Sequence, residues 1–472
     1  MIPAFQPFEF CLAIFRGLVA LAVTLHVLRT KRDTAAAIGW IGVVWLMPLC
    51  GGALYLMFGV NRVRRRARRV ARRHRRDLRT AQRDTGTEAE GEFRRLSRML
   101  DALTEYPLVS GNAVTCLQDG DNAYPAMLCA IAEARRSVVL CSYIFRRDEV
   151  GMAFVEALDE ARARGVAVRV LVDGVGSGYF HCGIQRALRQ RGIVCRRFMH
   201  SFWPWRMPFI NLRNHRKILA VDGRIGFMGG LNIGAENRLR SRPRHPVADM
   251  HFQLEGPIVA QLTEIFARDW FFACGEELES EVFFPKHCAP VGSTLLRAVP
   301  SGPDNDFEKI EYAMLQGITL ARESVRIVTP YFLPDERLLT VLCLAALRGV
   351  TVDIIVPSRS NHRLIDYARD ATLMPFCDAG CRIWLAAPPF NHAKLMVVDR
   401  QWCFVGSANV DARSLRLNFE INMGIYSREL ADSLAEFVDG LKGRRVGRAD
   451  LEKLPKIVKL RNASVRLLMP YL

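Results

Sequence analysis

Residues 214–234 read NHRKILAVDGRIGFMGGLNIG, and residues 391–411 read NHAKLMVVDRQWCFVGSANVD. When the two stretches are aligned, several polar and glycine residues recur at the same internal spacing. The paired positions are His215/His392, Lys217/Lys394, Asp222/Asp399, Gly229/Gly406, Gly230/Ser407 and Asn232/Asn409. A lone histidine in a strand is more often structural than catalytic. Two matching sets of polar residues instead indicate duplicated chemistry.

The spacing inside each stretch predicts where its polar side chains meet. The run from histidine to aspartate has the apolar, β-branched character of a strand. Because strand side chains alternate faces, a histidine and a lysine two residues apart point to one side. The next strand ends at Gly229–Gly230 or Gly406–Ser407, where backbone can approach a phosphate closely. Asn232 and Asn409 then supply amide donors, so two facing units would enclose a phosphate.

This set of side chains suits transfer at a phosphodiester. One neutral histidine attacks phosphorus and forms a phosphohistidine, while the other, protonated, donates to the departing alkoxide and later accepts a proton from the incoming alcohol. An unperturbed histidine pKa of ~6.5 lets both states coexist at neutral pH. The lysines and amides stabilise the non-bridging oxygens. Histidines acting as metal ligands are the weaker alternative, because a lysine beside each one already supplies a cation. No cofactor is therefore expected.

The repeat extends beyond the two polar stretches. Residues 126–138 (AMLCAIAEARRSV) match residues 313–325 (AMLQGITLARESV), and RGVAVRVLVDG from Arg164 matches RGVTVDIIVPS from Arg348. Each pair reads as a helix with a glycine stop or a turn, followed by a buried strand. Helices that alternate with short apolar strands predict an α/β fold. The 13 cysteines are scattered and odd in number, which favours free thiols in a reducing compartment. Cys377 and Cys381 lack a second pair suited to zinc.

The N-terminal 60 residues predict a helical membrane anchor. Residues 38–60 carry no charge and are long enough to cross a hydrocarbon core of ~30 Å. Pro48 and Gly51–Gly52 could kink that helix, which membrane helices tolerate. Residues 8–28 are also apolar but contain Arg16 and His26. They are therefore expected to form a second span, with a helix lying at the interface as the alternative.

A block of arginines follows these segments and accounts for much of the net charge of +18. Eleven arginines lie between residues 62 and 79, and such a block seeks anionic phosphate groups. The positive-inside rule predicts that the block, and everything after it, is cytoplasmic. Residues 80–92 read as a polar linker. The aromatic stretch 198–209 (FMHSFWPWRMPF) is expected either to meet the membrane interface or to pack in the core.

The paired His-x-Lys-x₄-Asp motifs, with Gly-Gly or Gly-Ser before Asn, resemble those of the phospholipase D superfamily from about Pro107 to the C-terminus. The N-terminal segments, the arginine block and the NLRNHRKILAVDGRIGFMGGLNIG wording are similar to bacterial cardiolipin synthases in particular. The resemblance implies two α/β lobes, each a mixed sheet flanked by helices, with the site between them and no metal. It also implies joining of two phosphatidylglycerols into cardiolipin, with release of glycerol, at a bacterial inner membrane.

The same resemblance implies roles for single residues. His215 is expected as nucleophile and His392 as acid/base, with Lys217 and Lys394 beside them and with Asp222 and Asp399 mostly supporting structure. A further acidic residue in each lobe orients a histidine: Glu420 fits well, and Asp249 less closely. Asn232, Asn409, Gly230 and Ser407 complete the phosphate-binding set.

The expected division of the chain is 1–60 for the membrane segments, 61–105 for the basic region and linker, 106–290 for lobe 1 and 291–472 for lobe 2. Three other functions stay open. A phospholipase D would use water or another alcohol as acceptor, and the motifs alone do not separate it from a synthase. A nuclease is disfavoured because the basic block adjoins a membrane span. A scaffold protein would have no use for two intact motifs.

Overall fold

The computed structural model describes residues 7–31, 34–59, 89, 91–198, 213–278, 281–285, 288–302, 306–467 and 469. The arginine block, most of the linker and nearly all of the aromatic stretch 198–209 lie outside these residues. The chain divides into an N-terminal unit and a much larger unit that holds both polar motifs. Each unit is described by itself.

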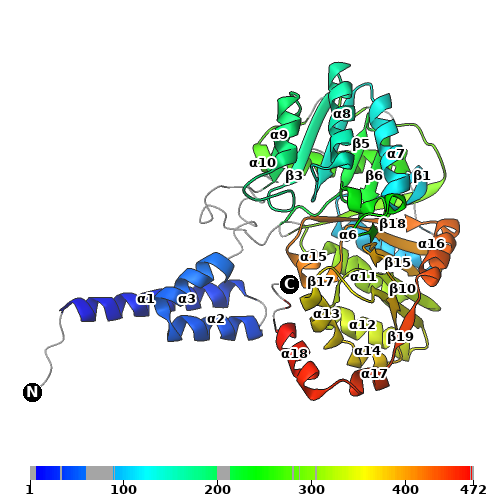
Figure 1. The fold of residues 1–472 in the computed structure, drawn as a ribbon. Coiled ribbons are helices and arrows are strands. Elements are labelled where there is room, and N and C mark those ends of the chain that lie inside the picture. The colour runs from blue at the N-terminus through cyan, green and yellow to red at the C-terminus, as the bar shows by residue number, and fades with distance from the viewer. Residues whose placement is uncertain are drawn as a thin grey trace, which may run out of the picture. The chain divides into compact units, whose positions relative to one another are not determined.

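The N-terminal unit is a group of helices in contact with one another (Figure 1): α1 (Pro7–Thr30), α2 (Thr34–Leu46), α3 (Pro48–Leu54) and the π-helix η1 (Tyr55–Gly59). Two polar contacts hold it together: His26 Nδ1 lies 2.8 Å from the Tyr55 hydroxyl, and Trp45 Nε1 donates to Thr24 Oγ1 at 3.1 Å. Gly52 allows close packing, because a Cβ there would lie 2.9 Å from the Val19 side chain.

Of the two apolar stretches, the first forms one continuous helix and the second is divided in two. Residues 9–30 form the one helix, among the described ranges, that is long and apolar enough to cross a membrane, with a mean hydropathy of 2.1, although the stretch contains Arg16. Residues 38–60 were expected to form a single helix. The structure instead breaks them at Met47, because Pro48 has no N–H to continue α2 and begins α3. Neither α2 nor α3 alone is long enough to cross ~30 Å of hydrocarbon.

The larger unit is built on one continuous mixed sheet. Its strand order is β19-β13-β12-β10-β15-β16-β18-β9-β1-β8-β6-β5-β2-β3-β4. The seven strands from β1 to β4 belong to lobe 1, and the eight from β19 to β9 belong to lobe 2. Figure 1 shows the lobes one above the other, each with helices against its part of the sheet. The lobes meet where β1 pairs with β9 in an irregular antiparallel register.

The strands that lobe 1 contributes to this sheet are β1 (Val109–Gln118), β2 (Ser137–Ser142), β3 (Ala167–Asp173), β4 (Val194–Phe198), β5 (Ile218–Val221), β6 (Ile225–Gly229) and β8 (Met250–Glu255). Those of lobe 2 are β9 (Thr294–Ser301), β10 (Ser324–Val328), β12 (Thr351–Pro357), β13 (Arg382–Ala386), β15 (Leu395–Val398), β16 (Trp402–Gly406), β18 (Glu420–Tyr426) and β19 (Arg444–Val446). In each lobe three neighbouring strands are parallel (β2-β3-β4 and β10-β12-β13), and the strands between them and the lobe boundary are antiparallel. Lobe 2 has one further edge strand, β19, which pairs antiparallel with β13. The two lobes therefore repeat one topology, and the predicted α/β fold is confirmed.

The helices of lobe 1 are α7 (Asp119–Glu133), α8 (Glu149–Ala163), α9 (Gly183–Gln190) and α10 (Ile258–Cys274). Those of lobe 2 are α6 (Phe93–Leu103), α11 (Lys309–Leu320), α12 (Glu336–Leu347), α13 (Arg363–Asp370), α14 (Met374–Asp378), α15 (Ala412–Arg416), α16 (Arg428–Gly440), α17 (Arg448–Glu452) and α18 (Lys456–Arg466). The two RGV repeats end α8 and α12 as expected. Gly165 and Gly349 have φ of +88° and +93°, values that only glycine adopts without strain.

Helix α6 belongs to the fold of lobe 2, although its residues were expected in the linker region 61–105. Phe93, Leu96 and Leu100 are buried in the core of lobe 2, and the Phe93 ring stacks on Trp402 at 6.0 Å. The buried Arg297 guanidinium donates to Ser97 O and contacts the Asp101 carboxylate. The folded two-lobed unit therefore includes residues well before position 106.

Candidate active site

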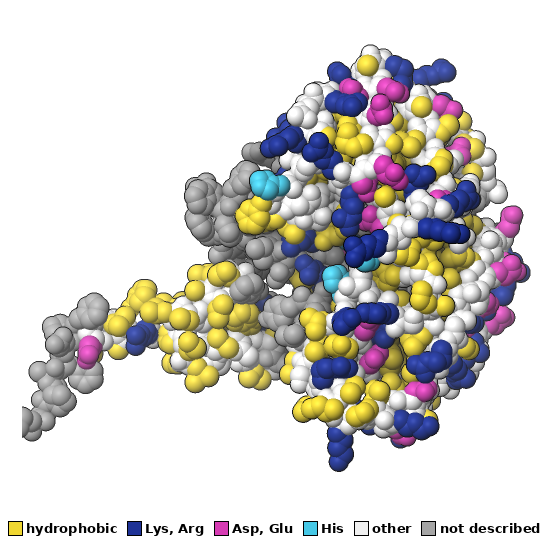
Figure 2. Space-filling view, in the orientation of Figure 1, with side chains coloured by type: hydrophobic (Ala, Val, Ile, Leu, Met, Phe, Trp, Pro, Cys, Tyr) yellow, Lys and Arg dark blue, Asp and Glu magenta, His cyan; other side chains and the backbone are white. Residues whose placement is uncertain are grey.

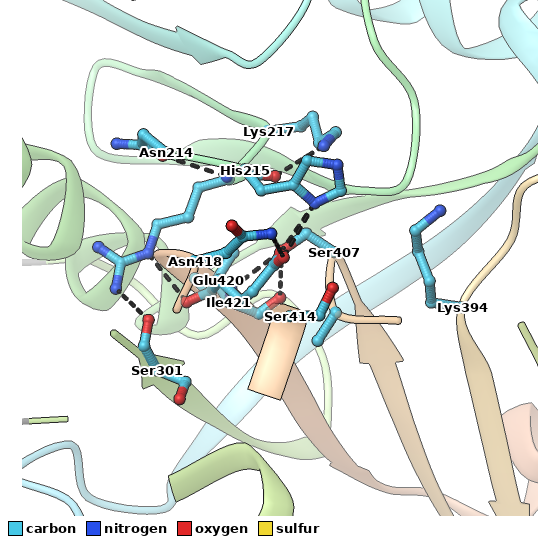
Figure 3. Close-up of polar contacts among 12 residues, drawn as sticks. Asn214, His215, Lys217, Ser301, Lys394, Ser407, Ser414, Asn418, Glu420 and Ile421 are labelled. Atoms are coloured by element: carbon cyan, nitrogen blue, oxygen red, sulfur yellow. Dashed lines mark hydrogen bonds and ion pairs between the residues drawn. The ribbon is translucent and has the colours of Figure 1, made fainter. Parts of the chain in front are cut away.

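His215 is held in place by the opposite lobe. It lies just before β5 of lobe 1, and its backbone N–H donates to Phe419 O of lobe 2 at 2.9 Å. Its side-chain Nδ1 lies 3.0 Å from the carboxylate of Glu420, the first residue of β18. The Glu420 carboxylate also accepts from Ser407 Oγ and from Asn418 Nδ2 (Figure 3). The buried carboxylate thus has several donors around it and a fixed orientation.

His392 is held in the reciprocal way. Its backbone N–H donates to Ala248 O of lobe 1 at 2.7 Å, and its Nδ1 lies 2.8 Å from Asp249 Oδ2. The strand register makes the two carboxylates equivalent, because Gly229 pairs with His251 and Gly406 pairs with Asn422, each two residues after its acid. Each lobe therefore supplies one histidine and the acidic partner of the other histidine. We call this arrangement the crossed clamp.

The electrostatics fix the protonation of both rings. Contacts with His215 and Lys217 hold the pKa of Glu420 below the usual carboxyl value despite burial, and the Lys394 charge with the His392 hydrogen bond does the same for Asp249. Burial lowers the pKa of His215, and burial with the Lys394 charge lowers that of His392 to about 3. Each neutral ring then donates from Nδ1 to its carboxylate and presents the lone pair of Nε2 to the site. Burial thus shifts both histidines away from the unperturbed pKa of ~6.5, toward the neutral form.

The two motif lysines lie beside the histidines. Lys217 Nζ donates to His215 O at 2.7 Å, and Lys394 Nζ donates to His392 O. In Figure 3, Lys217 is drawn directly above the His215 ring, and Lys394 is drawn to the right of the cluster. Burial lowers the pKa of Lys217 to about 8 and that of Lys394 to about 7. The strands begin only after the lysines, at Ile218 and Leu395, so each His-x-Lys segment lies just before its strand and not within it.

The motif aspartates contact backbone amides. Asp222 accepts from the N–H groups of Arg135, Arg136 and Ser137 at 2.8–2.9 Å. Asp399 accepts from those of Arg322, Glu323 and Ser324 at 2.8 Å. Each aspartate thereby ties the turn after the motif strand to the start of the central strand, β2 or β10. This geometry supports a structural role.

The residues at the glycine and asparagine positions of the motifs make different contacts in the two lobes. A Cβ on Gly230 would lie 2.2 Å from Asp249 Oδ1, so the acid itself requires a glycine there. Ser407, at the matching position of lobe 2, instead donates its hydroxyl to Glu420. Asn232 Oδ1 accepts from Ile144 N at 3.2 Å. Asn409 is buried, and its Oδ1 has no hydrogen-bond partner within the described part of the chain.

A buried ion pair beneath His215 was missed by sequence reasoning. Arg216 Nη1 lies 2.6 Å from Asp269 of α10, and both side chains are 4% exposed. The guanidinium also donates across the lobe boundary to Glu420 O and Ser301 O, at 2.9 and 3.1 Å. The repeat itself held a signal, because lobe 2 has Ala393 where lobe 1 has Arg216. An arginine inside an otherwise duplicated motif has a function that only one lobe needs.

Two tyrosines next to the histidines were also missed. The Tyr143 ring lies 4.7 Å from the His215 ring, and Lys217 Nζ lies 5.2 Å from the centroid of Tyr143. The Tyr331 ring lies 6.4 Å from the His392 ring. Each tyrosine follows the central strand of its lobe, in SYIF or TPYF, which was the available signal. Of the aromatic stretch 198–209, Phe198 is described and is buried against Phe272 and Phe419.

Comparison with known proteins adds two family matches. The family model described as "Cardiolipin synthase, PLD-like domain" matches residues 127–270 and 314–441, one segment in each lobe. The model described as "Phospholipase_D-nuclease N-terminal" matches residues 18–59. A cardiolipin synthase of Geobacillus sp. (strain WCH70) is 33% identical, with 98% of this chain and 92% of the relative aligned. Cardiolipin synthase A of Pseudomonas putida (strain GB-1) is 32% identical, with 96% of both chains aligned.

A solved structure agrees in fold. Phosphatidylserine synthase of Haemophilus influenzae Rd KW20 aligns with a TM-score of 0.62, covering 80% of this chain and all of that one, at 13% identity. At that identity the likeness concerns the fold alone. The paired lobes therefore also occur in an enzyme of distant sequence.

Proposed function

The chain belongs to the cardiolipin synthase family of phospholipase-D-like phosphatidyltransferases, and we propose that it transfers a phosphatidyl group from one phosphatidylglycerol to another, giving cardiolipin and glycerol. The observation that carries the proposal is the crossed clamp. Two buried histidines, each orientated by an ionised carboxylate and flanked by a lysine, form a site for an anionic phosphodiester and two successive displacements.

The first displacement cleaves the donor lipid. His215 Nε2 attacks phosphorus and forms a P–N bond, while the P–O bond to the glycerol headgroup breaks. His392 donates the proton that the departing glycerol oxygen needs. Lys217 and Lys394 stabilise negative charge on the non-bridging oxygens. The phosphatidyl group is then held on His215, and glycerol leaves.

The second displacement builds the product. A glycerol hydroxyl of another phosphatidylglycerol gives its proton to His392, and its oxygen attacks phosphorus. The P–N bond breaks, which releases cardiolipin and returns His215 to its neutral state. Both histidines end as they began, so the cycle consumes no other reactant.

Because the pKa of His392 is lowered in the free site, the bound substrate must raise it before His392 can act as an acid. His392 is neutral in the free site, so it must gain a proton as the donor lipid binds. The phosphodiester anion favours that charge, because a negative group in a buried site raises the pKa of a nearby imidazole. Asp249 stabilises the resulting imidazolium from the other side. Substrate binding therefore produces the acid that the first displacement uses.

The enzyme is membrane-associated, and we propose the inner membrane of a bacterium with the catalytic unit on the cytoplasmic side. The length and composition of α1 support the anchor. The arginines between residues 62 and 79 support the orientation by the positive-inside rule.

Product analysis tests this function. Purified full-length protein, exhaustively treated with chelator, is incubated with phosphatidylglycerol vesicles, and the lipids are identified by mass spectrometry. Cardiolipin with equimolar glycerol is expected. Phosphatidic acid as the main product would show that water is the acceptor and would contradict the proposal. His215→Ala is the inactive control, and His181→Ala, at an exposed histidine, should retain the activity of the unaltered protein.

A further inference from the structure

The last helix of the chain has one face packed firmly on lobe 2. Asn462 of α18 is 2% exposed. The Arg461 guanidinium lies 3.7 Å from the ring centroid of Tyr367 on α13. Val465 and the nearby Met469 pack against a small apolar cluster formed by Leu333, Ile365 and Ala368. These contacts fix the orientation of α18 and decide which of its side chains point outward.

The outward face of α18 is apolar and bordered by basic residues. Ile457, Leu460 and Leu467 are 72%, 64% and 76% exposed. Their spacing of three and seven residues places them on one side of the helix. Lys456, Lys459, Arg461 and Arg466 are exposed on the same helix, and residues 456–467 contain no acidic side chain. Figure 2 shows yellow side chains with dark-blue ones beside them where α18 lies in Figure 1.

Among the residues that the structure describes, no carboxylate forms a salt bridge with Lys456, Lys459, Arg461 or Arg466. Lys459 Nζ donates to the backbone carbonyl of Glu452 at 2.7 Å, while the Glu452 carboxylate pairs with Arg448 at 2.6 Å. Large aliphatic side chains bordered by lysine and arginine on one helix are the pattern of a helix that lies in a membrane interface. The basic border selects an anionic lipid surface.

The buried face of α18 leads toward the active site. The cluster that receives Val465 and Met469 also packs against Tyr331, whose ring lies 6.4 Å from the rings of both His392 and Phe390. The apolar cluster and Tyr331 therefore connect α18 to the His392 side of the site.

We propose that α18 is an interfacial helix that binds the surface of an anionic bilayer and holds the His392 side of the catalytic site against it. Ile457, Leu460 and Leu467 enter the acyl boundary, and the basic side chains meet lipid phosphates. This contact is additional to the N-terminal anchor. Lipid binding by α18 requires no turnover, so it can be tested without the proposed function. Only the benefit of that binding for catalysis rests on the proposed function.

Photo-crosslinking of the full-length protein tests the contact. A photoreactive phenylalanine analogue replaces Leu460, or Leu347 of α12 as a matched control that is 69% exposed. Each variant also carries His215→Ala and is reconstituted in vesicles of equal parts phosphatidylcholine and phosphatidylserine. Lipid adducts should form several-fold more at position 460 than at 347, and should decrease in pure phosphatidylcholine. Equal capture at both positions, no lipid capture, or capture of a second protein chain at 460 would overturn the proposal.

A kinetic comparison tests the consequence for catalysis. Ile457→Ser with Leu460→Ser should lower kcat/KM several-fold on bilayer phosphatidylglycerol and leave it unchanged on a short-chain, water-soluble phosphatidylglycerol. Leu347→Ser should change neither. An equal loss on both substrates would show a folding or site defect and contradict the proposal. If the unaltered protein makes no cardiolipin, the proposed function fails, while the crosslinking result still decides the role of α18.

Discussion

At the residue scale, the two histidines have corresponding partners, a carboxylate and a lysine each, but different predicted tasks. His215→Ala and His392→Ala should each remove nearly all activity, and the double variant should be little worse, because the residues act in one cycle. Substrate labelled in the phosphatidyl group should leave label on His215 after rapid quenching. Label on His392 would reverse the roles. Configuration at phosphorus should be retained, and inversion would refute the covalent intermediate.

Substituting the acids that contact the histidines should lower activity, whereas substituting the motif aspartates should lower stability. Glu420→Gln and Asp249→Asn remove the charge that orientates a histidine, so kcat should fall by about 10²- to 10⁴-fold. Asp222→Ala and Asp399→Ala leave backbone N–H groups without an acceptor, which should lower the free energy of unfolding by about 1–3 kcal/mol. Their kcat per folded molecule should change little. Unfolding curves and kcat for the four variants check this, and a large kcat loss in folded Asp222→Ala would contradict it.

The lysines predict an alkaline limit to activity. Lys394 and Lys217 lose their charge as the pH rises through about 7 and about 8, so kcat/KM for an anionic substrate should fall over that range. Lys394→Arg keeps its charge and should move the limit to higher pH. Stability should change in the opposite direction. Unfolded lysines titrate near ~10.4, so the unfolded state binds more protons above pH 7 and the fold gains stability as the pH rises. An unchanged pH profile in Lys394→Arg would contradict this.

At the scale of elements, α10 and the motif of lobe 1 are linked by the Arg216–Asp269 pair. Arg216→Met leaves a buried carboxylate unpaired and should lower stability by about 3–5 kcal/mol. It should also lower kcat, because the guanidinium holds Glu420 O. Arg216→Met with Asp269→Leu should recover much of the stability and little of the kcat. Thermal unfolding in detergent, with kcat, measures both. Equal stability of the single and double variants would show that the charge pair is not the cause.

The elements show how far sequence reasoning reached. Periodicity and the two RGV stops predicted α8, α12 and the strands after them, because those signals are local. The sequence analysis treated Pro48 as a possible kink within one helix. Sequence alone does not show whether a proline bends a helix or divides it into two. The crossed clamp was not predicted: Asp249 lies 143 residues from His392, and its partner depends on how the lobes meet. The burial of Phe93 in lobe 2 was not predicted, because the residues before it resemble a polar linker.

At the scale of the whole molecule, the orientation in the membrane can be tested with native thiols. Cys129 and Cys274 are exposed on the catalytic unit. A membrane-impermeant maleimide should leave both unlabelled in intact spheroplasts and should label them after permeabilisation. Peptide mass spectrometry locates the label. Labelling of either cysteine before permeabilisation would place the catalytic unit outside the cell and contradict the positive-inside argument.

The crossed clamp also says something about descent. Two lobes that repeat one topology and lend each other an acid are arranged as the two copies of a symmetric homodimer would be. Because both lobes lie in one chain they can differ, and Arg216 against Ala393, with Gly230 against Ser407, are differences that a homodimer could not hold. Neither half can be inherited as a working enzyme without the other. Selection therefore acts on the two lobes together, because a mutation that removes the acid of one lobe disables the histidine of the other.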